Sequence, residues 1–295
     1  LKRRTVTARD FESGVRILVI GLGSKVIIAD RVGMLWNNVQ TIGFNSISTP
    51  LAWLGAVAYS MELYFDFAGY SMMAVGLGKM LGFQIPVNFR FPYISKSVTE
   101  FWRRWHISLS TWFKEYLYIP LGGNREGTLK TYRNLMIVFF LTGLWHGASW
   151  NFVIWGLFHG TFLVLERIFP IEKILHFRLL KSIYTLLVVI VAWVFFRAET
   201  LGSAWAYLNR MFVPYDMESY SKYLSNEFVY VAVLALASCG FGAMLYRRLF
   251  ALIGRENWGN AVVRAVNPAF CAVIAYFSVL LLASNTYNPF IYFRF

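Results

Sequence analysis

The chain has 295 residues, of which 58% are hydrophobic and only 15% are charged. A soluble globular domain carries about 25% charged residues, so the composition excludes that class and favours a polytopic membrane protein. The net charge of +13 comes from basic residues in short connections between apolar runs. This placement indicates cytoplasmic loops of a membrane protein and argues against a nucleic-acid partner.

The first part of the chain is predicted to contain two membrane segments. Residues 15–37 are apolar but interrupted by Lys25, Asp30 and Arg31, so they form either a short, tilted span or a re-entrant helix. Residues 52–83 exceed the ~20 residues that a span needs. They contain Glu62 and Asp66, which the i, i+4 spacing places on one helical face. These acids either accept hydrogen bonds from neighbouring groups or mark an ion path.

Residues 84–133 carry too many charges for a simple span, with eight Lys or Arg against three Glu. Their middle, residues 101–118, is nonetheless amphipathic, because large apolar side chains recur at three- and four-residue intervals: Phe101, Trp105, Leu109, Trp112 and Tyr116. Ser97 and Glu100 fit a capping box just before it. We expect one helix that lies in the membrane interface on the cytoplasmic side.

The second half of the chain is predicted to be mostly membrane helices. Residues 131–149 and 150–169 form a hairpin that turns at GASWN, and further spans cover 181–196, 228–246 and 265–283. If 84–133 is cytoplasmic, alternation places the basic loop 247–264 inside and the acidic segment 199–227 outside, as the positive-inside rule requires. We therefore predict an all-α polytopic fold with about seven spans and an outer C-terminus.

Three histidines are the candidate chemical groups. His146 lies in an apolar run, where desolvation favours the neutral imidazole that a general base needs, and the flanking glycines at 143 and 147 permit close approach of backbone or substrate. His106, beside Arg103 and Arg104, is either a packed interfacial residue or a contact to an entering acyl donor. His159 is expected to be a packing residue.

Other chemistries find little support in the residues. The chain has no P-loop, no GxSxG elbow, no HExxH and no paired CxxC motif. Three dispersed histidines without cysteine or acidic neighbours make no convincing metal site. Cys239 and Cys271 lie in apolar segments and give no disulfide framework. We therefore expect no metal and no bound cofactor.

Four stretches together carry a family resemblance: ELYFDFAGYSMMAVGLGKMLGF, FRFPYISKSVTEFWRRWHISLSTWFKEYLYIPLGGNR, LTGLWHGASWNFVIWGLFHG and the terminal FIYFRF. In these the chain resembles the membrane-bound O-acyltransferase (MBOAT) family, in its bacterial branch of alginate O-acetylation type. The stretches cover about half of the chain and keep the family's order. Two positions depart from the pattern: Met72 replaces an acid, and Arg90 stands where relatives often carry Asn.

The resemblance implies a fold, a site and partners. The fold would be a ring of tilted and transmembrane helices around a central tunnel, with residues 1–295 forming one membrane-embedded domain that lacks its N-terminal spans. His146 would be the catalytic histidine and His106 the second histidine of the site. The residues predicted to bind substrate are Trp145, Arg103, Arg104, Trp105 and Asn151.

The implied reaction is O-acetyl transfer in the bacterial cytoplasmic (inner) membrane, in contact with membrane lipid. Acetyl-CoA or an acyl carrier would supply a thioester donor from the cytoplasm. The acceptor would be an exported polysaccharide such as alginate, and a periplasmic acetyltransferase would be the partner. Two alternatives remain open: a transporter of acyl groups, motivated by Glu62 and Asp66, and a scaffold that recruits the periplasmic enzyme.

Overall fold

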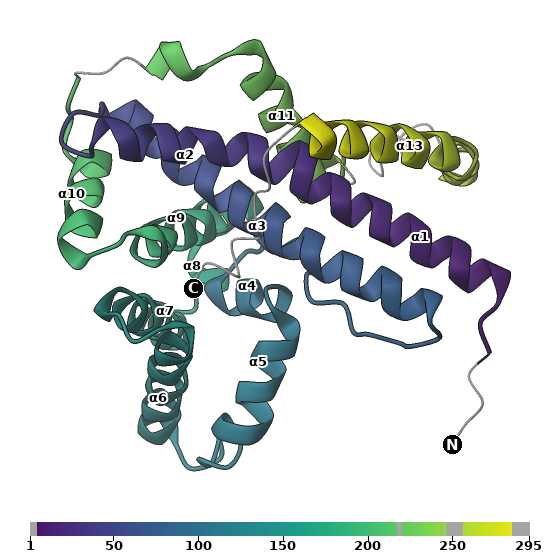
Figure 1. Ribbon diagram of the computed structural model, residues 1–295. Helices are drawn as coiled ribbons and strands as arrows, with labels where there is room; N and C mark the ends of the chain where they lie inside the picture. Colours follow the sequence, from purple (N-terminus) through teal and green to yellow (C-terminus); the bar gives the residue numbers. More distant parts are fainter. Residues whose placement is uncertain (1–4, 217–219, 243, 246–255, 285–295) are drawn as a thin grey trace. The chain divides into compact units, whose positions relative to one another are not determined.

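The computed structural model describes residues 5–216, 220–242, 244–245 and 256–284, and every regular element within these ranges is helical (Figure 1). The all-α prediction is therefore confirmed. The predicted basic pair Arg247 and Arg248 and the terminal FIYFRF motif lie outside the described residues. The chain divides into two compact units, which are described separately below.

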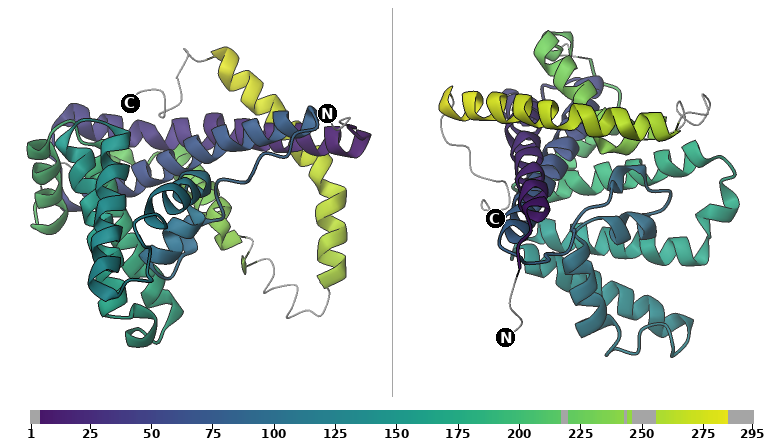
Figure 2. Two further views of the ribbon diagram at one scale, coloured as in Figure 1. Left: turned by 90° about the horizontal axis from the view of Figure 1, so that it is seen from below. Right: turned by 90° about the vertical axis from the view of Figure 1, so that its right-hand side faces the viewer.

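The first unit comprises Leu1–Met34, Met61–Val87 and Leu224–Arg294. Its long N-terminal helix begins as α1 (Ala8–Gly23), passes through a π-helical turn (Ser24–Ala29) and continues as α2 (Asp30–Ile42). The two views of Figure 2 show this helix running on from α1 into α2. The segment predicted as a short span or re-entrant helix is thus one extended helix, because its charged residues are accommodated without a break.

Lys25 explains how that helix tolerates charge. Its side chain is almost fully buried and forms ion pairs with Asp30 at 2.7 Å and with Asp66 at 2.6 Å. Asp66 lies on α3 (Thr49–Met80). A buried carboxylate is costly unless it is paired, so this contact gives Asp66 the structural role that the sequence left open.

The remaining helices of the first unit are α11 (Asn226–Leu236), a π-helical turn (Ala237–Phe241) and α13 (Glu256–Ser284), which packs against α1. The span predicted at 228–246 is interrupted at Gly240, whose φ of 104° is favourable only for glycine. The described helix therefore kinks within the predicted span, and the span itself stays a prediction.

The second unit comprises Leu35–Ser60 and Asn88–Tyr223. After the first residues of α3 it contains the following helices in chain order: a 3₁₀ turn (Pro92–Ile94), α4 (Val98–Arg104), α5 (Ile107–Phe113), a π-helical turn (Lys114–Tyr118), α6 (Thr128–His146), α7 (Trp150–Ile168), α8 (Ile171–Ile174), α9 (Arg178–Arg197), α10 (Leu201–Phe212) and a 3₁₀ turn (Tyr220–Tyr223). Its core is aromatic, and Phe101, Trp155 and Trp193 are almost fully buried there.

Helices α6 and α7 form the predicted hairpin and lie side by side (Figure 1). A Cβ atom at Gly143 would collide with the carbonyl of Phe152, and one at Gly156 would collide with the carbonyl of Phe139. Small residues allow membrane helices to approach this closely. The space at Gly143 is therefore taken up by the backbone of α7, so of the two expected neighbours, backbone or substrate, it is backbone that approaches this glycine.

Two described helices are long and apolar enough to cross a membrane, namely α9 (Arg178–Arg197) and residues Asn267–Ser284 of α13. The first coincides with the span predicted at 181–196, and the second lies within α13, where 265–283 was predicted. The figure of about seven spans and the order in which they cross stay predictions.

Candidate active site

The single interfacial helix predicted over 101–118 is in fact broken in the middle. Helix α4 ends at Arg104, Trp105 is extended, and α5 begins at Ile107. Between them His106 adopts the left-handed conformation (φ 44°, ψ 56°), which among the described non-glycine residues is shared only by Phe91. Such a conformation costs about 1–3 kcal/mol and persists where surrounding contacts fix it.

The segment 88–90 supplies those contacts. The carbonyl of Asn88 accepts a hydrogen bond from the Ile107 N–H at 3.0 Å, and the Arg90 N–H donates to the carbonyl of Arg104 at 3.0 Å. The Asn88 side chain also accepts from the N–H and the hydroxyl of Ser108, at 3.0 and 2.9 Å. These bonds cap the first turn of α5 and hold the chain on both sides of His106.

The His106 side chain is buried, with only 8% of its surface exposed. Its Nδ1 lies 3.5 Å from the Ser108 hydroxyl. Burial lowers the pKa of His106 to about 4, because desolvation disfavours the charged imidazolium. The ring is therefore neutral at physiological pH and has one nitrogen able to accept a proton.

His146 is the last residue of α6, at the start of the turn 147–149, and it is half-buried. Aromatic rings surround it: Trp155 and Phe196 have ring centroids 5.0 and 5.1 Å away. Because it ends α6, its side chain lies beside the turn that connects α6 to α7.

Trp145 connects the two histidines. Its half-exposed ring lies 4.8 Å from the ring of His146 and 6.4 Å from that of His106, measured between centroids. Two segments that are 40 residues apart in sequence thus bring their histidines to one place.

The other residues predicted to bind substrate make contacts within the protein. Arg104 donates to Glu100 from both Nε and Nη2, at 2.9 and 2.6 Å. Trp105 is buried in the aromatic core, with its ring 5.0 Å from that of Trp193. Asn151 is buried and donates to the carbonyl of Ala198. These three residues hold α4, α7 and α9 in place, and a role in substrate binding stays a prediction for each.

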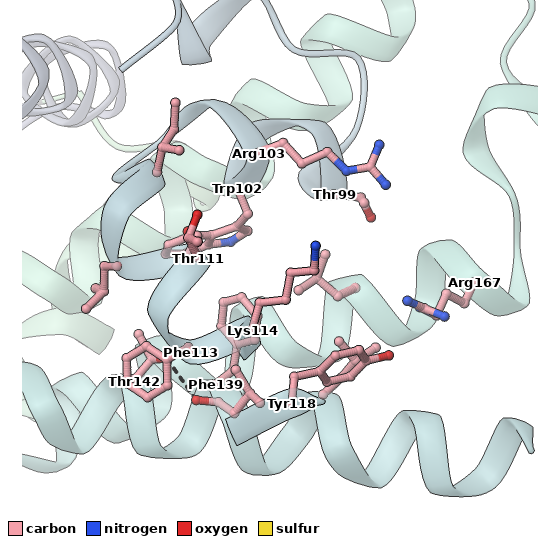
Figure 3. A pocket seen from close by; sticks show the side chains of 16 residues that line it. Thr99, Trp102, Arg103, Thr111, Phe113, Lys114, Tyr118, Phe139, Thr142 and Arg167 are labelled. Atoms are coloured by element: carbon pink, nitrogen blue, oxygen red, sulfur yellow. Dashed lines mark hydrogen bonds between the residues drawn. The ribbon is translucent and has the colours of Figure 1, made fainter. Parts of the chain in front are cut away.

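Arg103 differs because it faces a cavity of about 440 Å³. Residues of α4, α5, the following π-helical turn, α6 and α7 line this cavity (Figure 3). Its lining includes Trp102 and Phe139 on the apolar side and three basic residues, Arg103, Lys114 and Arg167. Ile107, next to His106, and Thr142, one helical turn before His146, also line it, whereas neither histidine is among the lining residues.

His159 is fully buried among Phe101, Trp102 and Trp155, with the ring of Trp102 only 5.0 Å away. Neither ring nitrogen has a hydrogen-bond partner among the described residues. This position agrees with the expected packing role. No group of three or more metal-binding side chains occurs in the described part of the chain.

Sequence reasoning missed two residues that position the site. Asn88 was not singled out in the sequence, although its side chain is suited to capping. Glu166 accepts hydrogen bonds from the Thr99 N–H and hydroxyl, at 2.9 and 2.7 Å, and from the Val98 N–H. The signal for Glu166 was a lone acid near the end of the apolar α7, because such an acid needs a partner.

Comparisons with known proteins show which family the chain is similar to. The profile of the MBOAT, membrane-bound O-acyltransferase, family matches residues 2–202. The probable alginate O-acetylase AlgI of Azotobacter vinelandii is 40% identical, over 99% of this chain and 64% of the relative. The peptidoglycan O-acetyltransferase of Helicobacter pylori is 45% identical over 69% of this chain and 39% of the relative. The teichoic acid D-alanyltransferase of Bacillus subtilis is 34% identical, over 53% and 41% respectively.

The chain spans less than two thirds of the length of each of these relatives.

Proposed function

Because the chain belongs to the membrane-bound O-acyltransferase family, we propose that it forms the catalytic part of a membrane O-acetyltransferase. The acceptor would be an exported polysaccharide, with alginate the first choice because the relative of Azotobacter vinelandii is a probable alginate O-acetylase. The donor would be a thioester, acetyl-CoA or an acetylated carrier, that arrives from the cytoplasm. A periplasmic acetyltransferase would complete the modification outside a bacterial inner membrane.

The proposed chemistry centres on His146. Its imidazole would accept the proton of the acceptor hydroxyl while the hydroxyl oxygen attacks the thioester carbonyl. A C–O bond forms, the C–S bond breaks, and the proton passes from His146 to the departing thiolate. General-base catalysis of this kind contributes typically 10²–10⁴-fold to the rate, and the aromatic rings around His146 would help to exclude water that hydrolyses thioesters.

The observation that carries this proposal is the convergence of His106 and His146 on Trp145, whose ring centroid lies 6.4 Å from that of His106 and 4.8 Å from that of His146. His106 would stay neutral and contact the donor carbonyl or the acceptor. The transporter alternative is less well supported, because the carboxylate of Asp66 is already paired with Lys25.

The test uses the full-length protein in membranes with its natural partners. His146→Ala and His146→Gln should each lower acetyl transfer from labelled donor to polysaccharide by at least about 100-fold, as expected for loss of a general base. His176→Ala is the matched control, since His176 is exposed in a loop, and it should leave transfer unchanged. Normal acetylation by well-expressed His146 variants would rule out this mechanism and favour a transporter or scaffold.

A further inference from the structure

A second cavity lies within the first unit, where α1 begins and α3 ends. Its volume is about 390 Å³. The first turn of α1 contributes Asp10 to its wall, the end of α3 contributes Lys79, and the segment that follows α3 contributes Phe83 and Ile85. None of these residues takes part in the proposed acetyl transfer, so the cavity needs an explanation of its own.

Close packing of α1 against α3 gives the cavity a firm base. The two helices lie side by side (Figures 1 and 2), and a Cβ atom at Gly76 would collide with the carbonyl of Gly14. The ammonium group of Lys79 donates a hydrogen bond to the Ser13 hydroxyl at 2.9 Å, which joins the two helices again next to the cavity. The positions of Asp10 and Lys79 are therefore set by one rigid helix pair.

A reversal of the chain after α3 builds the remaining wall. Gly82 has a φ of 76°, a conformation that glycine adopts without strain. The Phe83 N–H then donates to the carbonyl of Gly78 at 2.7 Å, and a Cβ atom at Gly78 would collide with the side chain of Ile85. The segment thus folds back onto the last turn of α3 and encloses the cavity from that side.

The cavity holds one acid and one base that do not neutralise each other. Neither Asp10 nor Lys79 forms an ion pair within the described ranges. Oδ2 of Asp10 accepts hydrogen bonds from the hydroxyl and the N–H of Thr7, at 2.6 and 3.4 Å. These bonds lower the pKa of Asp10, so its carboxylate is ionised at neutral pH. The carboxylate keeps Oδ1 and the ammonium keeps two N–H groups for a ligand.

Exposed apolar side chains surround these two charges. Leu77 and Leu81 are about half exposed, and so are Phe83 and Ile85 in the cavity wall. Exposed apolar side chains gathered in one place mark a surface that contacts lipid or another protein. The cavity also lies where the predicted membrane segments 15–37 and 52–83 end, which is the depth of lipid headgroups. Its surroundings therefore favour a lipid as the occupant.

We propose that Asp10 and Lys79 bind the headgroup of phosphatidylethanolamine. The lipid phosphate accepts hydrogen bonds from the Lys79 ammonium, the primary ammonium of the lipid donates to the Asp10 carboxylate, and the acyl chains lie on the apolar rim. Phosphatidylcholine fits less well because its methylated ammonium has no N–H to donate. Phosphatidylglycerol has no cation to place at Asp10. This lipid site is independent of the proposed acetyl transfer and would hold the start of α1 and the end of α3 together.

The test is a lipid titration of the full-length protein in detergent, followed by native mass spectrometry. The probes are dioleoyl phosphatidylethanolamine, phosphatidylcholine and phosphatidylglycerol, which differ only in the headgroup. We expect phosphatidylethanolamine to bind at least about fivefold more tightly than either of the others, the ratio that corresponds to gaining one partly exposed ion pair.

Charge-removing variants locate the headgroup. Asp10→Asn keeps an oxygen that can accept the bonds from Thr7, so α1 remains capped. This variant should bind phosphatidylethanolamine no more tightly than phosphatidylcholine, and it should bind phosphatidylglycerol more tightly than the unmodified protein does. Lys79→Gln should weaken all three lipids by a similar factor, because all three carry a phosphate. Glu12→Gln is the matched control, since Glu12 is exposed on α1, pairs with Arg16 and does not line the cavity.

Three results overturn the proposal. The first is equal affinity of the unmodified protein for phosphatidylethanolamine and phosphatidylcholine, or a preference for phosphatidylglycerol. The second is a preference for phosphatidylethanolamine that survives in Asp10→Asn. The third is the same loss of preference in Glu12→Gln, which would assign the effect to the general charge of α1. Melting temperatures measured on the same samples check the fold, and Asp10→Asn decides the matter if Lys79→Gln does not fold.

Discussion

Glu166 gives the sharpest test of how the site is held together. Its carboxylate accepts hydrogen bonds from the Val98 N–H, the Thr99 N–H and the Thr99 hydroxyl, and so joins the end of α7 to the first turn of α4. A carboxylate at this position also interacts favourably with the helix dipole. We predict that Glu166→Ala loosens α4, which carries Arg103 and leads into His106.

The expected magnitude follows from those contacts. A hydrogen bond to a charged group contributes about 1.5–3 kcal/mol, and a buried N–H left without a partner costs about 1–3 kcal/mol. Val98 is fully buried while Thr99 is half-buried and accessible to water. We therefore expect Glu166→Ala to destabilise the start of α4 by roughly 2–4 kcal/mol. Glu166→Gln keeps one carbonyl oxygen as an acceptor and should lose about half of that.

Hydrogen exchange measures this effect directly. The amides of Val98 and Thr99 should exchange roughly 30- to 700-fold faster in Glu166→Ala, since each 1.4 kcal/mol is a factor of ten. Glu126→Gln is the control, because Glu126 forms only an exposed pair with Lys130, and it should leave these amides unchanged. Exchange of both amides at the rate of the unmodified protein would refute the capping role of Glu166.

Two further predictions concern pH and packing. Burial lowers the pKa of His106 from 6.5 to about 4. As pH falls, the unfolded chain therefore binds a proton before the native protein does, and the free energy of unfolding decreases by about 2 kcal/mol between pH 7 and pH 5. The variant His106→Asn tolerates the left-handed conformation and should lack this pH-dependent part of the stability. Chemical denaturation at each pH measures it, and equal pH profiles for the variant and the unmodified protein would contradict the prediction. Gly156→Ala should lower stability by about 1–3 kcal/mol because its Cβ meets the carbonyl of Phe139, whereas Gly202→Ala, in open space on α10, should not; comparable melting temperatures would contradict the close packing.

Apolar periodicity and turn residues were enough to predict the hairpin and α9. The run at 131–149 and its partner at 150–169 correspond to α6 and α7, and GASWN is the turn. These elements depend mainly on local pattern, because a continuous apolar run bounded by turn residues has few alternative structures. The sequence also singled out His106 and His146, since an ionisable group in an apolar segment is rare; their rings both lie near Trp145, and their catalytic role stays a prediction.

Non-local contacts decided the parts that were predicted wrongly. Residues 98–118 have a helical apolar pattern throughout, and nothing within them signals a break at His106. The break is fixed by hydrogen bonds that Asn88 accepts from Ile107 and Ser108 and that Arg90 donates to Arg104, and sequence reasoning cannot identify these partners. In the same way, the charged residues at 25 and 30 suggested an interrupted span, whereas pairing with Asp66 on α3 keeps that helix continuous.

The break at His106 also accounts for the cavity. Helix α4 packs against the hairpin through Trp102, whose ring lies 5.0 Å from that of Phe139. If α4 continued straight, the following helical turns would stay on its axis. The left-handed residue His106 instead turns the chain, so α5 and the next π-helical turn form a separate wall of the cavity, which includes Lys114. One strained residue thus separates the two walls and places its own imidazole near Trp145 at their junction. Glycine would adopt this conformation without the strain of about 1–3 kcal/mol, but it has no side chain and could not place an imidazole near Trp145.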